Sequence, residues 1–514
     1  MLVKIRSIAN IGLETVPVDV EVDVAQMGFP GFTIVGLASK AVDEARERVK
    51  TAIVNSKLDF PPRKITVNLA PADLPKDGAA YDLPIALGVL LASGQLLAPG
   101  IDLTKSFFYG ELSLDGTLRP TRGILLLGLF AQSLGPKSII YVPAPSAAEA
   151  SMISGTTVIP VNSLSQLVAH LSGEQKIAPL KLKTIPESAD FTAVEFDLKE
   201  IAGQEQAKRA LIIAAAGGHN LLMWGPPGTG KTMLSKALSG ILPPLSAQEA
   251  LEVTRIYSVS GLLSPGQALL SSRPFRSPHH GVSGAGMIGG GSNPLPGEVS
   301  LAHLGVLFLD EMPEFPRSIL ESLRQPMEDG TVEIVRVGGH VKYPASFTLI
   351  AAINPCPCGY LGHPKRECKC SERQITKYRH RISGPILDRI DLFVPVSAVE
   401  TEKLAITGNT ESNNISSVVA KAQVIKTRKI QEERFKKESG LYTNSQMKNT
   451  HVKKYGFLTP ESENLLRLAA NKFDFSARSY FRLIKVSRTI ADLEESEQIL
   501  PAHMAEALQY RQMI

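Results

Sequence analysis

The sequence predicts an α/β protein of two or three domains. The chain has 514 residues, 44% of them hydrophobic, and a single hydrophobic core seldom extends over that length. The first 172 residues combine strand-like and helix-like stretches. Residues 225–232 read Gly-Pro-Pro-Gly-Thr-Gly-Lys-Thr between an apolar strand and a helix, which is typical of a phosphate-binding loop.

The front of the chain supplies the elements of an α/β domain. Residues 17–24 alternate apolar and acidic side chains, which indicates a strand with one face in water. Residues 39–56 place apolar side chains at helical spacing, and residues 75–83 form a turn that opens an apolar helix. Residues 173–196 are polar and punctuated by proline, so we expect a linker there.

The phosphate-binding loop is the strongest motif of the sequence. Its glycines allow backbone angles that turn successive N–H groups toward phosphate oxygens at a helix N-terminus. Lys231 is expected to neutralise the β- and γ-phosphates, and Thr232 to hold Mg²⁺. The predicted ATP-binding residues are Gly225, Pro226, Pro227, Gly228, Thr229, Gly230, Lys231, Thr232 and Asp310.

Two later strand ends carry the groups that hydrolysis needs. An apolar run ends in Asp310 and Glu311. Asp310 would complete the Mg²⁺ site with Thr232, and Glu311 would polarise the attacking water. A second apolar run ends in Asn354, which is placed to orient that water.

The order of these three strand ends resembles an AAA+ ATPase, which implies a doubly wound parallel sheet followed by a helical lid. Arg389 maps to the arginine finger and Arg478, after Ser476-Ala477, maps to the second sensor. The expected catalytic residues are therefore Glu311, Asn354, Arg389 and Arg478. An arginine finger acts on the neighbouring subunit, so the resemblance implies a homo-oligomeric ring, a hexamer. The alternative is that each arginine pairs with a local carboxylate.

Other segments narrow the resemblance. A glycine-rich insert at residues 284–291 and the Gly-Glu-Val-Ser-Leu-Ala-His of residues 297–303 are similar to magnesium chelatase motor subunits and MCM helicases. Residues 273–280 and 354–359 resemble the bacterial YifB/ComM group of magnesium-chelatase-like ATPases. This resemblance covers nearly the whole chain. It implies a hexameric DNA helicase that drives branch migration of recombination intermediates during natural transformation.

The front domain resembles the proteolytic domain of Lon-type proteases, an S5-like α/β fold, through residues 76–78, residues 110–116 and Pro120. Where those proteases carry the catalytic serine and lysine, this chain has Ala80 and Leu125. Alanine has no nucleophile and leucine no proton acceptor, so Ser-Lys chemistry is lost. We expect a scaffold or assembly platform.

Basic residues mark two candidate DNA contacts. Residues 331–343 predict a hairpin, and in the related motors a hairpin at this place points into the ring pore. Its expected DNA-binding residues are Arg336, His340 and Lys342. Residues 418–437 hold seven basic and two acidic side chains. For both segments a solvated polar face is the alternative.

All four cysteines, Cys356, Cys358, Cys368 and Cys370, fall within fifteen residues. Two Cys-x-Cys pairs around a turn-rich loop suit one tetrahedral ion, and zinc is favoured. His363 is a substitute ligand, and free thiols or an iron–sulfur cluster are the alternatives. The metal is expected to brace the segment after Asn354.

Composition adds little about partners, because the net charge of +5 is the difference between 55 basic and 50 acidic side chains. The start has no signal-peptide core, and the apolar run of residues 83–97 is too short to span a bilayer. These features predict a cytoplasmic protein that does not act at a membrane.

The domains are predicted as a Lon-protease-like domain at residues 1–172, a linker at 173–196, an AAA+ core at 197–400 and a helical lid at 401–514. The predicted function is an ATP-dependent DNA motor with ATP, Mg²⁺ and zinc as cofactors and single-stranded or branched DNA and recombination proteins as partners. The first alternative is a magnesium-chelatase-type or protein-remodelling motor that acts on a protein. The second is a non-hydrolysing scaffold, which Asp310 and Glu311 argue against.

Overall fold

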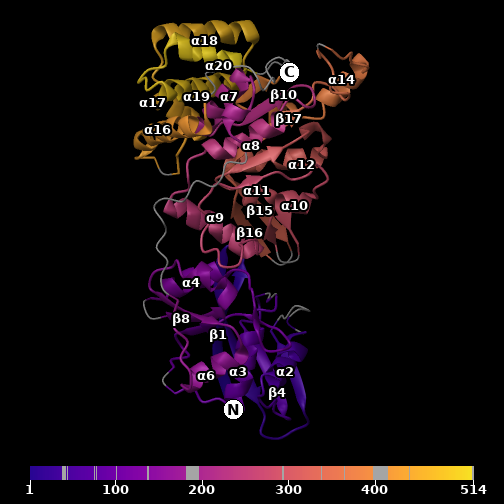
Figure 1. Ribbon diagram of the computed structural model, residues 1–514, viewed down its shortest axis with the longest axis vertical. Helices are drawn as coiled ribbons and strands as arrows, with labels where there is room; N and C mark the ends of the chain where they lie inside the picture. The colour runs from indigo at the N-terminus through magenta and orange to yellow at the C-terminus, as the bar shows by residue number, and fades with distance from the viewer. Residues whose placement is uncertain are drawn as a thin grey trace.

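A computed structural model shows two sheet-containing bodies stacked along the long axis, with a helical layer at the end opposite the N-terminus (Figure 1). No helix of the described chain is both long and apolar enough to cross a membrane. The structure describes residues 1–36, 42, 44–74, 76, 78–99, 101–135, 138–180, 196–291, 294–336, 339–363, 365–397, 415–438 and 440–511.

The front body is a seven-stranded sheet in the order β3-β4-β2-β1-β5-β8-β9. Alternation places Val18, Val20, Val22 and Val24 of β2 on the buried face. Helix α3 is buried on nearly every side, which accounts for its continuous apolar sequence. The strands are β1 (Leu2–Ile11), β2 (Glu14–Val24), β3 (Gly31–Val35), β4 (Lys64–Ala70), β5 (Ser106–Phe108), β8 (Ser138–Pro143) and β9 (Thr156–Val161), with a small hairpin of β6 (Glu111–Leu112) and β7 (Leu118–Arg119). The helices are α2 (Ala45–Asn55), α3 (Asp82–Ala92), α4 (Ile124–Ser133), α5 (Ala147–Ala150) and α6 (Leu164–Ser172).

Some expected elements differ in extent from those observed. The helix expected from residue 39 is observed as α2 from Ala45, while residues 37–41 and 43 lie outside the described chain. Most of the expected linker, residues 181–195, also lies outside it. Strand β1 was not predicted, because its apolar and polar residues do not alternate strictly.

The second body is built on a five-stranded parallel sheet in the order β11-β14-β17-β10-β18. Its central strands are buried on both faces, as parallel strands usually are. Leu221 and Met223 pack with the helices α7 and α8, whereas Leu222 packs with α12 on the other face. The strands are β10 (Leu221–Trp224), β11 (Phe275–Arg276), β14 (Val306–Leu309), β17 (Thr348–Ile353) and β18 (Leu392–Pro395). The longer helices are α7 (Glu205–Gly217), α8 (Lys231–Ile241), α9 (Ala247–Ser260), α12 (Arg317–Ser322), α13 (Arg324–Asp329) and α14 (Glu372–Arg379).

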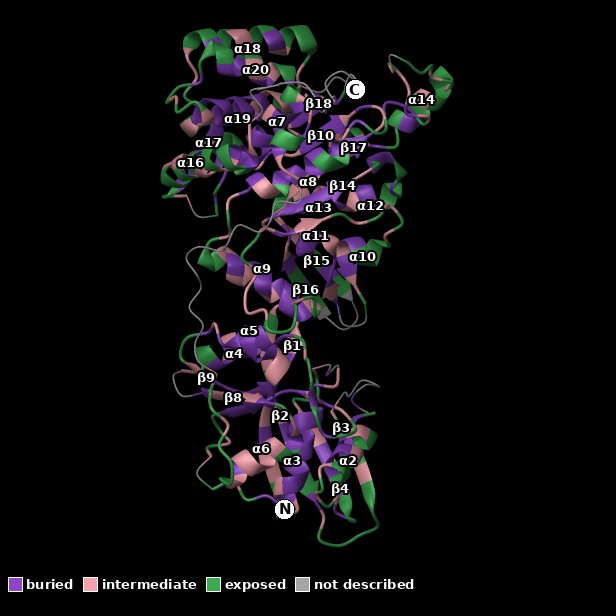
Figure 2. Cartoon of the chain, in the orientation of Figure 1, coloured by how far each residue is buried: buried purple, intermediate pink, exposed green. Residues whose placement is uncertain are grey.

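Small elements complete this body. A two-stranded ladder of β15 (Thr331–Arg336) and β16 (Gly339–Pro344) lies between α13 and β17 in the sequence. Helix α14 projects from the body and is mostly exposed (Figure 2). The remaining short elements are α10 (Gly284–Ile288), β12 (Gly289–Gly290), β13 (Leu295–Pro296), α11 (Glu298–Leu301) and α15 (Gly384–Leu387).

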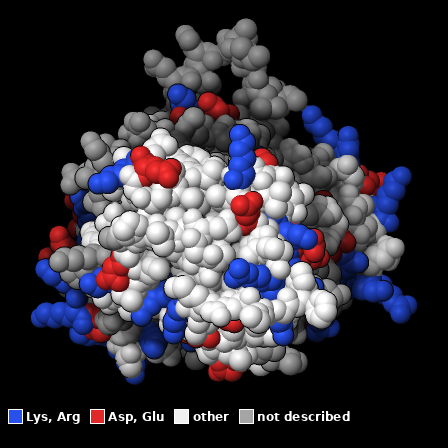
Figure 3. All heavy atoms as spheres, turned by 90° about the horizontal axis from the view of Figure 1, so that it is seen from below, with Lys and Arg blue, Asp and Glu red and all other residues white. Residues whose placement is uncertain are grey.

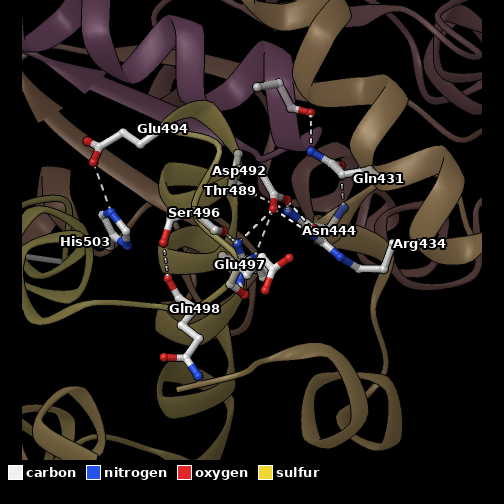
Figure 4. A network of polar contacts seen from close by, with 12 residues as sticks. Gln431, Arg434, Asn444, Thr489, Asp492, Glu494, Ser496, Glu497, Gln498 and His503 are labelled. Carbon is white, nitrogen blue, oxygen red and sulfur yellow. Dashed lines mark hydrogen bonds and ion pairs between the residues drawn. The ribbon is translucent and has the colours of Figure 1, made fainter. Parts of the chain in front are cut away.

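The C-terminal helices pack on α7 and α8 and share one apolar cluster with them. A polar network fixes their core (Figure 4). Asp492 accepts hydrogen bonds from Arg434 Nη1 (2.8 Å), Arg488 Nε (3.0 Å) and Asn444 Nδ2 (2.8 Å). His219, just before β10, contacts Thr489 Oγ1 at 2.8 Å and so joins this layer to the parallel sheet. The helices are α16 (Ser417–Phe435), α17 (Asn449–Tyr455), α18 (Pro460–Phe473), α19 (Ala477–Leu493) and α20 (Pro501–Gln509).

The two bodies meet through α9 and the β1–β2 turn. Ser258 Oγ of α9 donates to Glu149 Oε2 at 2.6 Å, and Gly123 N donates to Ser258 O at 3.0 Å. At the turn, Arg255 donates to the Leu13 carbonyl at 3.1 Å. Gly12 packs so tightly that an added Cβ would stand 2.2 Å from Val341 Cγ1 of β16. The front body therefore touches the β15–β16 hairpin directly.

Candidate nucleotide-binding site

The predicted phosphate-binding loop follows β10, between the ends of β17 and β18. An added Cβ on Gly225 would stand 2.0 Å from the Val396 carbonyl oxygen, so only glycine fits. Gly228 and Gly230 have φ angles of 76° and 88°, the region that glycine adopts at no steric cost. The loop ends where α8 begins, at Lys231, and the first N–H groups of that helix have no helical acceptor. These features make the loop a cradle for an anion.

Lys231 joins the loop to a neighbouring strand end. Its Nζ donates to the carbonyls of Gly225 (2.7 Å) and Pro226 (2.8 Å) and to Asn354 Oδ1 (3.3 Å). Burial lowers the pKa of Lys231, while the charges of Asp310 and Glu311 act in the opposite direction. The structure thus brings the lysine, both carboxylates and the asparagine to one edge of the sheet.

Asp310 follows β14 and faces α8. Thr232 Oγ1 donates to Asp310 Oδ2 at 2.9 Å, which places a hydroxyl and a carboxylate side by side. These are the hard oxygen ligands that Mg²⁺ prefers. Glu311 N donates to the other Asp310 oxygen at 2.9 Å, and Glu311 has a φ of 48°. That left-handed conformation is uncommon for a non-glycine residue, and strain of this kind clusters at functional sites.

Asn354 follows β17 and borders a small cavity of about 50 Å³. Trp224 and Tyr378 also line this cavity, together with apolar side chains. Sequence reasoning did not identify these aromatic residues, because Tyr378 comes from the distant helix α14.

Arg389 and Arg478 lie close together. Among the described residues, neither makes a polar contact with the phosphate-binding loop. Both guanidinium groups pair with Glu328 Oε1 at the end of α13. Arg389 also donates to the Pro385 carbonyl. For both arginines, the alternative to a contact with a neighbouring subunit is pairing with a local carboxylate. Glu328 forms such a pair with each of them. No sequence signal marks Glu328, since it lies about sixty residues from one arginine and 150 from the other.

The hairpin predicted at residues 331–343 is β15–β16, with Glu333 opposite Lys342 and Val335 opposite His340. Glu333 pairs with Lys342 at 3.4 Å and with His340 at 3.5 Å, so the exposed face carries an acidic residue beside the two basic ones. The side chain of Arg336 and residue 338 lie outside the described part of the chain.

The basic stretch of α16 is only partly available to a partner. Arg428 is partly buried and donates to the Ala215 carbonyl at 2.8 Å and 3.1 Å, and desolvation lowers its pKa to about 9. Arg434 belongs to the Asp492 network, and Lys426 pairs with Glu495. Two of the seven basic side chains, Arg428 and Arg434, are therefore engaged within the protein, and a DNA contact through this helix stays a prediction for the others.

The four cysteines form a compact cluster. The Sγ atoms of Cys356, Cys358 and Cys368 are 3.4–3.6 Å apart, and all four sulfur atoms lie within 4.8 Å of one another. Zinc–thiolate bonds of about 2.3 Å in a tetrahedron separate the sulfur atoms by about 3.8 Å, so the cluster fits such an ion. His363 Nδ1 accepts backbone hydrogen bonds from Lys365 and Arg366 at 3.1 Å and does not belong to this group of four.

In the front body, Ala80 and Leu125 are both buried. Lys76 is fully buried as well, its Nζ donates to the Pro71 carbonyl, and burial lowers its pKa. Asp77 lies outside the described residues.

Comparisons with known proteins agree with this arrangement. The model of the magnesium chelatase subunit ChlI matches residues 197–404, a second ChlI model matches residues 20–145, and the ChlI C-terminal model matches residues 414–511. Competence protein ComM of Haemophilus influenzae is 43% identical over 515 residues, which cover 99% of this chain and 97% of that protein. YifB of Salmonella typhimurium is 43% identical over 98% of this chain and 96% of its own length. The chain belongs to the YifB/ComM family of magnesium-chelatase-like proteins.

Membership of this family confirms the resemblance inferred from the motifs and the α/β fold class with an AAA+ core. The magnesium-chelatase 38 kDa subunit of Rhodobacter capsulatus is more distant, 30% identical over 31% of this chain and 50% of its own length. The close relatives therefore share the front domain, the core and the C-terminal helices, whereas the chelatase subunit matches a smaller part.

Proposed function

We propose that the protein is an ATP-hydrolysing ring motor that moves DNA during natural transformation. One observation carries the ATPase assignment: Lys231, Thr232, Asp310 and Asn354 converge at the carboxyl ends of three adjacent parallel strands. A ligand in an open parallel sheet binds at this edge.

In this proposal the loop amides and Lys231 bind the phosphates of ATP, which Lys231 reaches by leaving its two carbonyl partners. Thr232 and Asp310 hold Mg²⁺, which neutralises charge on the β- and γ-phosphate oxygens when it is bound. Glu311 accepts the proton of the attacking water, and Asn354 orients that water. Glu311 follows directly after the metal-binding carboxylate, and Asn354 already contacts Lys231.

The ring part of the proposal rests on Arg389 and Arg478. Among the described residues, the polar contacts of these arginines are made with Pro385 and Glu328, and none with the phosphate-binding loop of the same chain. Two neighbouring guanidinium groups suit the γ-phosphate of a neighbouring subunit, as an arginine finger does. A hexamer is the ring that the family resemblance implies.

DNA as the substrate is supported by the similarity to a protein named for competence and by the β15–β16 hairpin with exposed His340 and Lys342. We assign the hairpin to phosphate contacts in the pore, with Arg336 as a third residue, and branch migration of recombination intermediates as the work performed. Recombination proteins and branched DNA are the partners that this role requires. Binding through phosphates should weaken steeply with salt.

A second candidate is a motor that acts on a protein. The hairpin favours it in one respect, because Val335 is 68% exposed and Glu333 offsets the basic residues beside it. Hairpins of this composition suit a polypeptide as well as a nucleic acid.

The deciding experiment measures ATP hydrolysis with and without single-stranded and forked DNA. Hydrolysis stimulated by DNA, with the stimulation lost in His340→Ala/Lys342→Ala, is expected for the DNA motor. Glu311→Gln should bind ATP but lose hydrolysis by about 10²-fold or more, the usual contribution of a general base. Unstimulated hydrolysis that responds to a protein partner would favour the second candidate, and a wild-type protein without hydrolysis would exclude both.

For the cysteine cluster we propose a structural zinc ion held by Cys356, Cys358, Cys368 and Cys370. Four thiolates leave no open position for a substrate, which is typical of structural sites. The ion would brace the segment that joins Asn354 to α14, and metal analysis of anaerobically purified protein should give one zinc per chain.

A further inference from the structure

Glu328 occupies a position that the proposed ATPase chemistry does not use. Its Oε1 pairs with Arg389 of the core and with Arg478 of α19, so one carboxylate joins two segments that are 89 residues apart (478 − 389). The arginine contacts lower the pKa of Glu328, which keeps the carboxylate ionised.

The charges of this cluster are unequal. Two guanidinium groups face one carboxylate, and the Arg389 side chain is only 10% exposed. Arg389 Nε is buried and has no hydrogen-bond partner among the described residues. A buried guanidinium with an unsatisfied N–H is costly unless it is paired. Glu328 therefore compensates the charge of Arg389, and the Nε–H of Arg389 is left without a partner among the described residues.

Glu328 also lies at the base of the β15–β16 hairpin. It is two residues before Gly330, whose N–H donates to the Pro326 carbonyl at 2.9 Å. The Gly330 carbonyl accepts from Ala345 N at 2.7 Å, and Ala345 directly follows β16. A change in the position of α13 is thus passed to both strands of the hairpin.

We propose that Glu328 is a positioning residue that holds Arg389 and Arg478 when the neighbouring subunit has no γ-phosphate, and releases them when that phosphate arrives. The inference rests on the proposed function, in which these arginines act on the neighbour's ATP. A γ-phosphate competes with the carboxylate for the same two guanidinium groups. Release of Glu328 frees the end of α13, so the hairpin base shifts with the nucleotide state of the neighbour.

The test compares Glu328→Gln with the wild-type full-length protein. Glutamine keeps the shape but loses the charge, so both arginines are freer to enter the neighbouring site. The rate of ATP hydrolysis without DNA is expected to rise by about threefold to fivefold. This factor corresponds to the interaction free energy of a partly exposed ion pair. The DNA stimulation factor should fall toward one, because the contact that couples hairpin to arginines is gone.

Matched variants separate this role from a general structural one. Glu438→Gln removes a partly buried carboxylate of the C-terminal layer, which pairs with Lys454 at 2.8 Å and accepts from the Tyr455 hydroxyl at 2.8 Å, and should change neither rate. Adding Glu328→Gln to Arg389→Ala should give no gain in the basal rate over Arg389→Ala alone, since the gain acts through the arginine. Glu328→Ala removes the polar group altogether and should raise the basal rate as Glu328→Gln does. With two variants, the test still holds if one of them fails to fold.

An unchanged or lowered basal rate in both folded Glu328 variants would overturn the inference, as would a raised rate that persists without Arg389. These outcomes differ from failure of the proposed function. If the wild type hydrolyses ATP but does not respond to DNA, the DNA assignment fails while the basal rates still test Glu328.

Discussion

The arginines of this protein differ in burial, and their contacts differ accordingly. Arg428 and Arg434 are partly buried and donate to a backbone carbonyl and to Asp492, respectively, whereas Arg478 is 48% exposed and pairs with Glu328. Sequence patterns do not show which of these arginines is paired within the protein. Glu149 is a further case, because it is buried between the front body and α9 and accepts a hydrogen bond from Ser258.

Glu149 predicts a pH dependence of stability. Burial raises its pKa from the ordinary value of 4.5 to about 7, only partly opposed by the Ser258 hydrogen bond. The folded state therefore holds this proton more tightly than the unfolded state, and the contribution to the free energy of unfolding is lost as the pH rises from about 4.5 through about 7. Glu149→Gln is expected to be more stable than the wild type at pH 8 and to differ little from it at pH 5, as measured by thermal unfolding.

The control for this measurement is Glu44→Gln, which removes an exposed carboxylate of the same body. Its melting temperature should follow that of the wild type at every pH. Equal pH profiles for Glu149→Gln and the wild type would contradict the assignment.

At the scale of elements, the cysteine loop supports the phosphate-binding loop. An added Cβ on Gly359 would stand 2.7 Å from Cδ of Pro227, so the two loops are in direct contact. Cys356 is fully buried and its Sγ accepts from Leu361 N at 3.3 Å. Loss of the cluster should disturb the nucleotide site without changing any residue in it.

Cys356→Ser, or removal of metal by a chelator, is therefore expected to weaken ATP binding by about tenfold, the lower end of the range for losses around metal sites. The measurement is titration with a fluorescent ATP analogue. Pro278→Ala, outside both loops, serves as control. Undiminished ATP affinity in metal-free protein would show that the cluster does not support the loop.

How much of the site the sequence predicts depends on how far apart in the sequence the contacting residues lie. The phosphate-binding loop, Asp310, Asn354 and the four cysteines follow from local patterns, because each is a short motif at a strand end. The family resemblance added Arg389 and Arg478. Glu328 could not be predicted, since its contacts exist only when α13, the segment after α15 and α19 meet in space.

The same limit applies to the fold. Apolar strands and the apolar α3 were predicted because their patterns are regular. The internal contacts of the α16 arginines were not, because the hydrophobic pattern of that helix gives no face that is clearly internal. Contacts with α7 and α19, far away in the sequence, decide which of its cations are enclosed.

At the scale of the whole molecule, the front body makes direct contacts with the hairpin of the second body. Gly12 and Leu13 of the β1–β2 turn pack against the apolar cluster of β15 and β16. The opposite end of this body has a broad area with few charged side chains, bordered by both basic and acidic ones (Figure 3). The body also exposes Met27 and Phe29, which are 91% and 94% accessible.

Gly12→Leu should displace the hairpin, because its Cβ cannot share space with Val341 and the φ of Gly12 is 63°. We expect ATP hydrolysis without DNA to be retained and its stimulation by DNA to fall severalfold. Gly94→Leu, at another left-handed glycine with open space around it, controls for backbone strain alone. Full stimulation in Gly12→Leu would mean that the turn does not constrain the hairpin.

The contact at Gly12 also limits how freely the parts of this protein can be exchanged. A chimera that takes its first domain from a relative would keep its ATPase residues intact, yet it would work only if the donor turn is as narrow as this one. Designers of such chimeras should therefore transfer the β1–β2 turn and the facing strand β16 as one unit.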